Sequence, residues 1–497
     1  MPSIKAFFAK LYAARTYKKI QKWSSSPLET QNRVFQSLIS EAAATSFGVD
    51  HDFISINSHE DFVKRVPVRD YEALKPYVDK VVSGEANVLW KGKPLYFAKT
   101  SGTTSGAKYI PITKESMPSH VEAAKNAILL YIHQTGNTQI VDRKMIFLQG
   151  SPVLEDKNGV QLGRLSGIVA HYVPKYLQKN RLPSWETNCI EDWETKVNKI
   201  VQETIHEDMS IIAGIPSWVQ MYFEKLVDQK GQKVGDIFKN LNLFIFGGVN
   251  YEPYRSKFET LIGRKVDSIE LYPASEGFFA FQDLQNETGM LLQLDSGMFY
   301  EFISADTFFD ASHQRLTLKD VKIGVNYVII ISTTAGLWAY NIGDTVQFTS
   351  LAPFRVIVSG RIKHFISAFG EHVIAKEVEH ALLSALKATD ISVSEFTVAP
   401  QIAPSTELPY HEWFIEFENP PSDLKAFASK IDAAMQLQNS YYKDLVVGKV
   451  LQPLVITPVP KAGFQSYMKQ IGKLGGQNKT PRLSNDRKIA DALTKAI

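Results

Sequence analysis

The sequence predicts an α/β fold with a large N-terminal body of mixed β-sheets flanked by helices, followed by a small α+β C-terminal domain. From about residue 95 to 350, short apolar runs alternate with longer segments of helical periodicity, as in parallel strands joined by helices. Hydrophobic residues make up 44% and charged residues 22% of the 497 residues, which is enough core for two or three globular domains. A new helix and strand pattern begins near Ser359, so we expect the domains at residues 1–358 and 359–497.

The first expected element is a helix over residues 3–22, where apolar residues recur at helical spacing among six Lys or Arg residues and no acid. This composition fits a transit peptide or a helix lying on anionic lipid. We favour a third interpretation, a helix that packs on the body and leaves a basic face in solvent. Because no stretch approaches the ~20 consecutive apolar residues that span a bilayer, we expect no membrane span.

The body then continues with helices and turns over residues 29–80, including an extended break at 66–70 and a turn at 75–76, where prolines interrupt the pattern. Apolar runs at 243–246 and 266–271 predict two strands. Residues 325–334 and 337–342 predict a hairpin whose return strand ends at Gly343 and Asp344. In the second domain we expect a helix over 375–387, a strand over 412–417, a helix over 422–437 and a tail rich in Gly and Lys over 461–483.

Charge and cysteine content exclude several classes of protein. The formal net charge of +3 is too small to indicate nucleic-acid binding, which needs a concentrated basic face. A single cysteine, Cys189, cannot form an internal disulfide, which fits a reducing, cytoplasmic location. The eleven histidines show no metal-ligand spacing, so we expect no structural zinc.

Hydroxyl groups, two glycines and a lysine are concentrated in residues 100–108. Glycines at 102 and 106 allow successive backbone N–H groups to face one anion, and Lys108 supplies a countercharge. The spacing differs from that of the nucleoside-triphosphatase phosphate loop, which is therefore excluded. The alternative is a flexible surface connection. The residues we assign to phosphate binding are Thr100, Ser101, Gly102, Thr103, Thr104, Ser105, Gly106 and Lys108.

Four segments follow one another in a fixed order: residues 100–108, 272–277, 340–344 and 360–363. This order resembles the adenylate-forming superfamily of acyl-CoA synthetases, adenylation domains and luciferases. The chain is more closely similar to the Gretchen Hagen (auxin-responsive promoter) family of acyl-acid amido synthetases. That narrower resemblance extends through Leu74-Lys75-Pro76-Tyr77, Gly214-Ile215-Pro216-Ser217-Trp218 and Lys479-Thr480-Pro481-Arg482, and so covers nearly the whole length.

The resemblance implies a site for ATP and Mg²⁺. Glu276 follows a predicted strand and so projects into the crevice where open α/β sheets bind ligands; the family pattern implies that it holds Mg²⁺, which needs few carboxylates. Tyr272 is expected to stack on adenine and Ser275 to touch phosphate or ribose. Without these neighbours, a lone Glu after a strand is usually a surface residue.

Two further segments match the nucleotide side of the family site. Asp344 offers two acceptor oxygens to the adjacent ribose hydroxyls, although a Gly-Asp turn is a common structural feature. The chain has Asn341 and Ile342 where family members often carry a cation or Thr, which removes a possible phosphate contact. The adenine-side loop corresponds to Gly247, Gly248, Val249 and Asn250, for which a simple strand-ending turn is the alternative.

The resemblance also implies a mobile C-terminal domain. Lys363 corresponds to the hinge residue, and Lys479 to the mobile lysine that contacts the α-phosphate during adenylation. Lys473 is a competitor for this role because it also follows a glycine. We prefer Lys479 because Pro481 and Arg482 follow it.

The predicted activity is ATP-dependent adenylation of a carboxylic acid, followed by conjugation to the amine of an amino acid, with release of AMP and pyrophosphate. The alternatives are an acyl-CoA ligase that uses the same intermediate and a nucleotide-binding protein without turnover. The sequence identifies neither the acid nor the amine. For the acid pocket it offers only Trp218, Trp338 and the 120–170 region as candidates.

Overall fold

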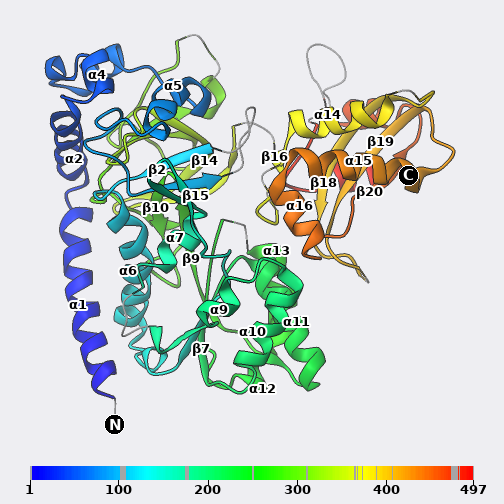
Figure 1. The fold of residues 1–497 in the computed structure, drawn as a ribbon, viewed down its shortest axis with the longest axis horizontal. Coiled ribbons are helices and arrows are strands. Elements are labelled where there is room, and N and C mark those ends of the chain that lie inside the picture. Colours follow the sequence, from blue (N-terminus) through cyan, green and yellow to red (C-terminus); the bar gives the residue numbers. More distant parts are fainter. Residues whose placement is uncertain are drawn as a thin grey trace.

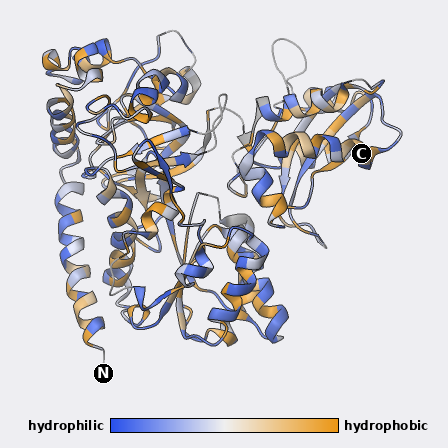
Figure 2. Ribbon diagram, in the orientation of Figure 1, coloured by the Kyte–Doolittle hydropathy of each residue, from blue (hydrophilic) through white to orange (hydrophobic). Residues whose placement is uncertain are grey.

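The computed structural model describes residues 3–100, 108–173, 178–248, 251–308, 310, 312–362, 365–366, 368–371, 373–387, 389–405, 407–471, 480 and 482–495. Within these ranges the chain forms a body with a long mixed sheet, and a smaller C-terminal unit set to one side of it (Figure 1). Helices around both units carry hydrophilic and hydrophobic residues in alternation (Figure 2), as expected where one face packs and the other meets water. The α/β fold with a C-terminal α+β unit is confirmed.

The long sheet of the body has the order β12-β13-β14-β15-β11-β10-β9-β8-β7-β3-β6 in the described part of the chain. The strands β6, β3, β7, β8 and β9 run parallel to one another, and every other pair in the sheet, beginning with β9 and β10, is antiparallel. These strands are β3 (Lys144–Phe147), β6 (Arg181–Leu182), β7 (Met209–Ala213), β8 (Leu243–Gly247), β9 (Asp267–Ala274), β10 (Gly277–Phe281), β11 (Met290–Leu292), β12 (Met298–Ser304), β13 (Asn326–Thr333), β14 (Tyr340–Leu351) and β15 (Phe354–Arg361).

A smaller sheet in the body has the order β2-β1-β5-β4. Its strands are β1 (Tyr96–Thr100), β2 (Lys108–Ile112), β4 (Glu155–Lys157) and β5 (Val160–Gly163). The helices of the body are α1 (Ile4–Ser24), α2 (Pro27–Ala42), α3 (Ser46–Asp50), α4 (His59–Arg65), α5 (Tyr71–Val82), α6 (Met117–Thr135), α7 (Leu165–Ala170), α9 (Trp185–Asn188), α10 (Trp193–Thr204), α11 (Pro216–Lys230), α12 (Val234–Ile237) and α13 (Glu252–Ile262), with short 3₁₀ turns η1 (Phe53–Ser55), η2 (Gln139–Val141) and η3 (Ala305–Thr307).

The long sheet curls back on itself. Tyr272 on β9 and Asp344 on β14 are separated by β10, β11 and β15, so in a flat sheet they would lie about 19 Å apart, at ~4.8 Å per strand. Instead the Tyr272 hydroxyl donates a hydrogen bond to Asp344 Oδ2 at 2.7 Å. Register shifts in the β9–β10, β13–β14 and β14–β15 pairs mark bulges, which bend strands and increase their twist.

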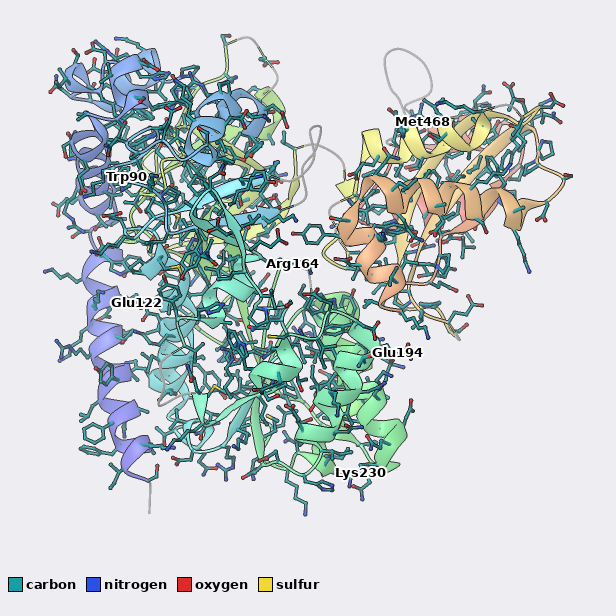
Figure 3. The ribbon with its side chains drawn as sticks, in the orientation of Figure 1. Trp90, Glu122, Arg164, Glu194, Lys230 and Met468 are labelled. Carbon is teal, nitrogen blue, oxygen red and sulfur yellow. The ribbon has the colours of Figure 1, made fainter. Side chains whose placement is uncertain are left out.

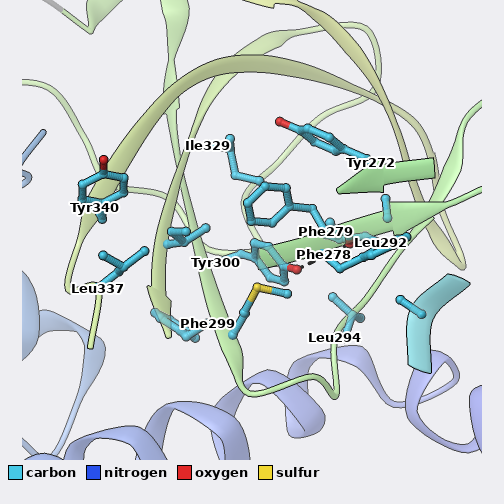
Figure 4. Close-up of a cluster of buried hydrophobic side chains, with 14 of the residues drawn as sticks. Tyr272, Phe278, Phe279, Leu292, Leu294, Phe299, Tyr300, Ile329, Leu337 and Tyr340 are labelled. Carbon is cyan, nitrogen blue, oxygen red and sulfur yellow. Dashed lines mark hydrogen bonds between the residues drawn. The ribbon is translucent and has the colours of Figure 1, made fainter. Parts of the chain in front are cut away.

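The interior of this curl is filled by a buried aromatic and aliphatic cluster (Figure 4). Phe279 lies edge-on to Tyr272, with ring centroids 4.9 Å apart, and both side chains are buried. Burial of such a side chain contributes about 1.5–3 kcal/mol. The core therefore fixes the backbone on which Tyr272 is carried. The cluster drawn includes Tyr272, Phe278, Phe279, Leu292, Leu294, Phe299, Tyr300, Ile329, Leu337 and Tyr340.

The C-terminal unit has a three-stranded sheet of order β18-β19-β20, in which β18 and β19 are antiparallel and β19 and β20 parallel. Helices α14 and α15 pack against one another and α15 contacts this sheet. The elements are β16 (Phe365–Ile366), β17 (Val373–Ile374), α14 (Ala375–Leu386), β18 (Ser392–Gln401), β19 (Tyr410–Asn419), α15 (Leu424–Gln438), α16 (Ser440–Val447), β20 (Val455–Val459), α17 (Gly463–Gln470) and α18 (Lys488–Thr494).

Three local predictions were wrong. Helix α5 runs through Pro76 without a turn, because Asp70 caps it and its apolar side chains Tyr71, Leu74 and Val78 are buried against the body. The return strand β14 does not end at Asp344 but continues to Leu351, since both β13 and β15 pair with it. A helix, α17, forms within the segment that was expected to be a tail.

Candidate functional site

A cavity of about 2630 Å³ lies where the carboxyl ends of the parallel strands meet the C-terminal unit. This edge is where open α/β sheets bind ligands, because the parallel strands all end there. The predicted site residues within the described part of the chain all line this one cavity. They are Thr100, Lys108, Gly247, Gly248, Tyr272, Ser275, Glu276 and Asp344.

The other predicted site residues lie outside the described ranges. They are the phosphate-loop residues Ser101, Gly102, Thr103, Thr104, Ser105 and Gly106, the adenine-side residues Val249 and Asn250, and the lysines Lys363, Lys473 and Lys479.

Strands β1 and β2 border the predicted phosphate loop on both sides. Thr100, the last residue of β1, is paired with Lys108, the first of β2. The Lys108 ammonium lies 5.5 Å from the centroid of the Tyr71 ring, and the Tyr71 hydroxyl accepts a hydrogen bond from the Tyr109 backbone N–H. The end of the loop is therefore held at the cavity wall by contacts with Tyr71 of α5, and its start is held there by pairing with β2.

The turn between β9 and β10 carries Ser275 and Glu276. Ala274 and Gly277 are paired across the two strands, so Ser275 and Glu276 form a two-residue turn at the edge of the sheet. A Cβ at Gly277 would lie 2.4 Å from Met298 Sδ, which excludes a larger residue unless the methionine moves. The tight turn explains why the Glu276 carboxylate is presented at the cavity, as the sequence predicted.

Glycines at the end of β8 let the backbone itself form part of the wall. A Cβ at Gly247 would lie 2.5 Å from the Leu271 carbonyl oxygen of the neighbouring β9. Gly248 has φ +77°, a left-handed conformation that residues with a Cβ rarely adopt. The chain can therefore turn sharply there and leave bare backbone facing the cavity.

Asp344 lies within β14, next to a glycine in the chain and paired with β15. Gly343, just before it, has φ +88°, and Asp344 itself is paired with Arg361 of β15. The carboxylate is buried and accepts the Tyr272 hydroxyl. A carboxylate has about four acceptor positions, which suits it to a site with several donors.

A polar wall that the sequence did not reveal lies at the ends of β3 and β6. The Gln149 side-chain oxygen accepts from Arg181 Nη2 at 2.7 Å, and its backbone carbonyl accepts from Lys196 Nζ at 3.1 Å. Burial lowers the pKa of Arg181 to about 10 and that of Lys196 to about 8. Among the described residues, Arg181 Nε and Gln149 Nε2 are buried without a hydrogen-bond partner. These three residues are scattered over 47 positions of sequence, so no motif marked them.

Helix α6 and the strand ends beside it supply an apolar side of the cavity. His120 is buried in this wall, and burial lowers its pKa to about 4, so it is neutral at pH 7. Of the pocket candidates from sequence, Trp218 and much of the 120–170 region line the cavity. Trp338 does not: it is fully buried in the body core and its indole N–H donates to the Leu89 carbonyl. Apolar lining residues are Val121, Ala124, Ile128, Leu129, Met145, Phe147, Val169 and Ile211.

Helix α16 joins the C-terminal unit to the body at the cavity. Arg164, just before α7, faces the C-terminal unit (Figure 3), and its Nη2 lies 2.5 Å from Asp444 Oδ2. The same guanidinium lies 5.0 Å from the centroid of the Tyr441 ring, and the Tyr441 hydroxyl donates to the Lys99 carbonyl at 3.2 Å. Burial raises the pKa of Tyr441. The cavity is thus bounded by both units, and no sequence pattern identified this contact.

Within the described ranges, no group of three His, Cys, Asp or Glu side chains is placed to hold a metal ion. The helices that the structure describes include none long and apolar enough to cross a bilayer.

Three family domains match the chain in sequence: the GH3 family N-terminal domain over residues 16–188, the GH3 family central domain over 291–361 and the GH3 family C-terminal domain over 376–488. The indole-3-acetic acid-amido synthetase GH3.15 of Arabidopsis thaliana is 22% identical to it, over 91% of this chain and 90% of that protein.

Two solved structures share the fold. One, AtGH3.15 acyl acid amido synthetase in complex with 2,4-DB, aligns with a TM-score of 0.62 at 16% identity, over 100% of this chain and 97% of the other. The second, a 2-hydroxyisobutyryl-CoA ligase in complex with 2-HIB-AMP and CoA, aligns with a TM-score of 0.56 at 14% identity, over 100% and 93%.

Proposed function

We propose that this chain, which belongs to the GH3 family, is an ATP-dependent acyl-acid amido synthetase. In the first step a carboxylate oxygen of the acid bonds to the α-phosphorus of ATP, and pyrophosphate leaves. In the second step the amine of an amino acid bonds to the acyl carbon, the bond from that carbon to the AMP oxygen breaks, and the amine loses a proton. The observation that supports this function is the gathering of the described nucleotide-site residues in one cavity at the carboxyl ends of parallel strands.

The two anionic reactants must be brought together, so charge on the triphosphate has to be offset. Backbone N–H groups and hydroxyls of residues 100–106 together with Lys108 are suited to the β- and γ-phosphates. Glu276 fits as the protein ligand of Mg²⁺, because this ion takes one or two carboxylates and completes its shell with phosphate oxygens and water. When bound, the ion would neutralise phosphate charge.

On the nucleoside side we assign Asp344 to the ribose hydroxyls, with Tyr272 holding its carboxylate in place through the 2.7 Å hydrogen bond. The bare backbone at Gly247 and Gly248, continuing into Val249 and Asn250, is assigned to adenine, with the Tyr272 ring beside it and Ser275 toward phosphate or ribose. The apolar wall along α6 suits the carbon skeleton of the acid.

We further propose that residues 1–358 and 359–497 move relative to one another about Lys363, so that one cleft serves both half-reactions. In this scheme Lys479 reaches the α-phosphate during adenylation, and the contact between Arg164 and Asp444 belongs to one of the two arrangements. The substrates are small molecules, and we place the enzyme in the cytoplasm on the strength of its single cysteine.

The experiment is acid-dependent pyrophosphate release by the wild type and by Glu276→Ala, with a panel of carboxylic acids. Loss of the Glu276 carboxylate should abolish release, whereas Glu287→Ala, which removes an exposed carboxylate, should leave it unchanged. Full activity of Glu276→Ala would contradict the assignment.

A second candidate function is that of an acyl-CoA ligase, which shares the adenylation step and differs in the acceptor. The shared fold with a CoA ligase supports this candidate. Mass spectrometry of the products formed from one acid with coenzyme A or with mixed amino acids separates the two. ATP binding without acid-dependent AMP would instead indicate a binding protein without turnover.

A further inference from the structure

One face of α1 is exposed along its whole length and changes character halfway. With 3.6 residues per turn, positions 4, 11, 15 and 22 point in nearly the same direction. On the N-terminal half this face is apolar, and its five large side chains are between 53% and 79% exposed; they are Ile4, Phe7, Phe8, Leu11 and Tyr12. On the C-terminal half the same face carries four exposed cations, Arg15, Lys18, Lys19 and Lys22.

The opposite face of α1 accounts for its attachment to the body. Ala6, Ala13 and Ile20, each seven residues apart, are buried, and Tyr17 stacks on His133 of α6 with ring centroids 4.2 Å apart. Ser3 donates to the Asp142 carboxylate at 2.6 Å. This face alone packs α1 on the body, as the sequence interpretation favoured. The packing does not account for the exposed apolar half of the outer face.

We infer that α1 docks this enzyme on an anionic lipid surface, with the apolar half entering the headgroup boundary and the basic half lying over the anionic headgroups. Large apolar side chains followed by cations on one helix face match the two layers of a membrane interface. Helix α1 contains no acidic residue, so none of its side chains would repel anionic headgroups.

The charge distribution argues against a second copy of this chain as the occupant. If two α1 helices paired in parallel, four cations would face four cations. If they paired antiparallel, each apolar half would lie against the basic half of the other. The parallel pair would therefore bring like charges together, and the antiparallel pair would remove cations from water against an apolar surface.

The position of α1 connects this surface with the cavity. Ile4, Lys5, Phe8 and Tyr12 of α1 also line the cavity, beside the apolar wall of α6. In Figure 1, α1 lies on the flank of the body opposite the C-terminal unit. Docking by this helix therefore brings one rim of the cavity to the lipid surface and leaves the C-terminal unit in solution.

The test is co-sedimentation of the full chain with phosphatidylcholine vesicles containing about one third phosphatidylserine. We expect binding to these vesicles, little binding to pure phosphatidylcholine, and a loss of binding as salt is raised. Phe7→Ala with Leu11→Ala should weaken binding by at least about tenfold. The change of Lys18, Lys19 and Lys22 to Gln should weaken it by about a hundredfold, at about fivefold per cation.

Matched controls separate the face from general surface properties. Ile54→Ala with Leu437→Ala removes apolar side chains that are 84% and 88% exposed on other elements, and the change of Lys230, Lys239 and Lys265 to Gln removes three exposed cations elsewhere. Both should bind like the wild type. Absence of binding to anionic vesicles, or equal losses in test and control variants, would overturn the proposal. So would sedimentation equilibrium showing a dimer that the Phe7 and Leu11 changes dissociate, if no vesicle binding accompanies it.

Discussion

The buried pair of Tyr272 and Asp344 gives the sharpest test of the nucleotide site. Asp344→Asn keeps the shape of the side chain but removes its charge and one acceptor oxygen. A hydrogen bond to a charged group contributes about 1.5–3 kcal/mol, so loss of one ribose bond should weaken ATP binding by about 10- to 150-fold. Tyr272→Phe removes only the donor that orients the carboxylate, at 2.7 Å, and should weaken binding less, by about three- to tenfold.

The assay is the dissociation constant of ATP from calorimetry, with the Michaelis constant for ATP in pyrophosphate release as a second readout. The double variant should lose less than the sum of the two single changes, because the hydroxyl acts through the carboxylate. Tyr131→Phe is the matched control: its hydroxyl donates to Asp267 at 2.8 Å, and neither residue lines the cavity. The reasoning is refuted if Asp344→Asn binds ATP like the wild type, or if Tyr131→Phe weakens binding as much as Tyr272→Phe.

Two further predictions concern the buried cation and the domain contact. The pKa of Lys196 is about 8 in the folded chain, against an ordinary 10.5. Between these two pH values the unfolded chain holds one more proton than the folded chain, so the free energy of unfolding rises with pH, by about 3 kcal/mol in total. Denaturant titrations should therefore show that the free energy of unfolding depends less on pH in Lys196→Met than in the wild type, and an equal pH dependence would contradict the buried charge. Arg164→Ala removes a half-exposed ion pair to Asp444 and a cation–aromatic contact, each contributing roughly 0.5–1 kcal/mol. Small-angle scattering should then show an open population larger by about five- to thirtyfold. Arg143→Ala, which removes an ion pair with Asp208 within the body, should not produce this change.

The fold could be predicted where side-chain chemistry is local. Residues 326–333 form β13 as expected, because their β-branched and apolar side chains suit a strand buried on both faces. The turn predicted at Pro76 does not form, because the cap and the buried side chains of α5 stabilise the helix by more than the loss of one helical hydrogen bond destabilises it. The extension of β14 to Leu351 was missed because its polar residues, such as Gln347, are held there by pairing with Asn326 of β13 and Ile357 of β15, which are contacts that no local pattern shows.

The candidate site divides in the same way. The sequence placed Glu276 at one strand end and, by family resemblance, Gly247 and Gly248 at another, and all three line the cavity. These positions could be predicted because a strand end and its turn are contiguous in the chain. The wall formed by Gln149, Arg181 and Lys196 was missed, as was the contact from Arg164 to α16, because these residues come together only through the order of strands in the sheet and the docking of the second unit.

The docking of α16 also has a consequence for how the two units communicate. The Tyr441 hydroxyl is bonded to the Lys99 carbonyl, and Lys99 directly precedes Thr100, where the predicted phosphate segment begins. Arg164, which holds both Asp444 and the Tyr441 ring, follows β5, the strand paired with β1. Any rotation of the C-terminal unit that breaks these contacts therefore removes the hydrogen bond that this unit makes to β1, at the end of the strand that borders the phosphate segment. A ligand shifts a conformational equilibrium only by its difference in affinity for the two states. A triphosphate bound to that segment would therefore shift the equilibrium between the two positions of the C-terminal unit. Departure of pyrophosphate would remove this shift before the amine binds.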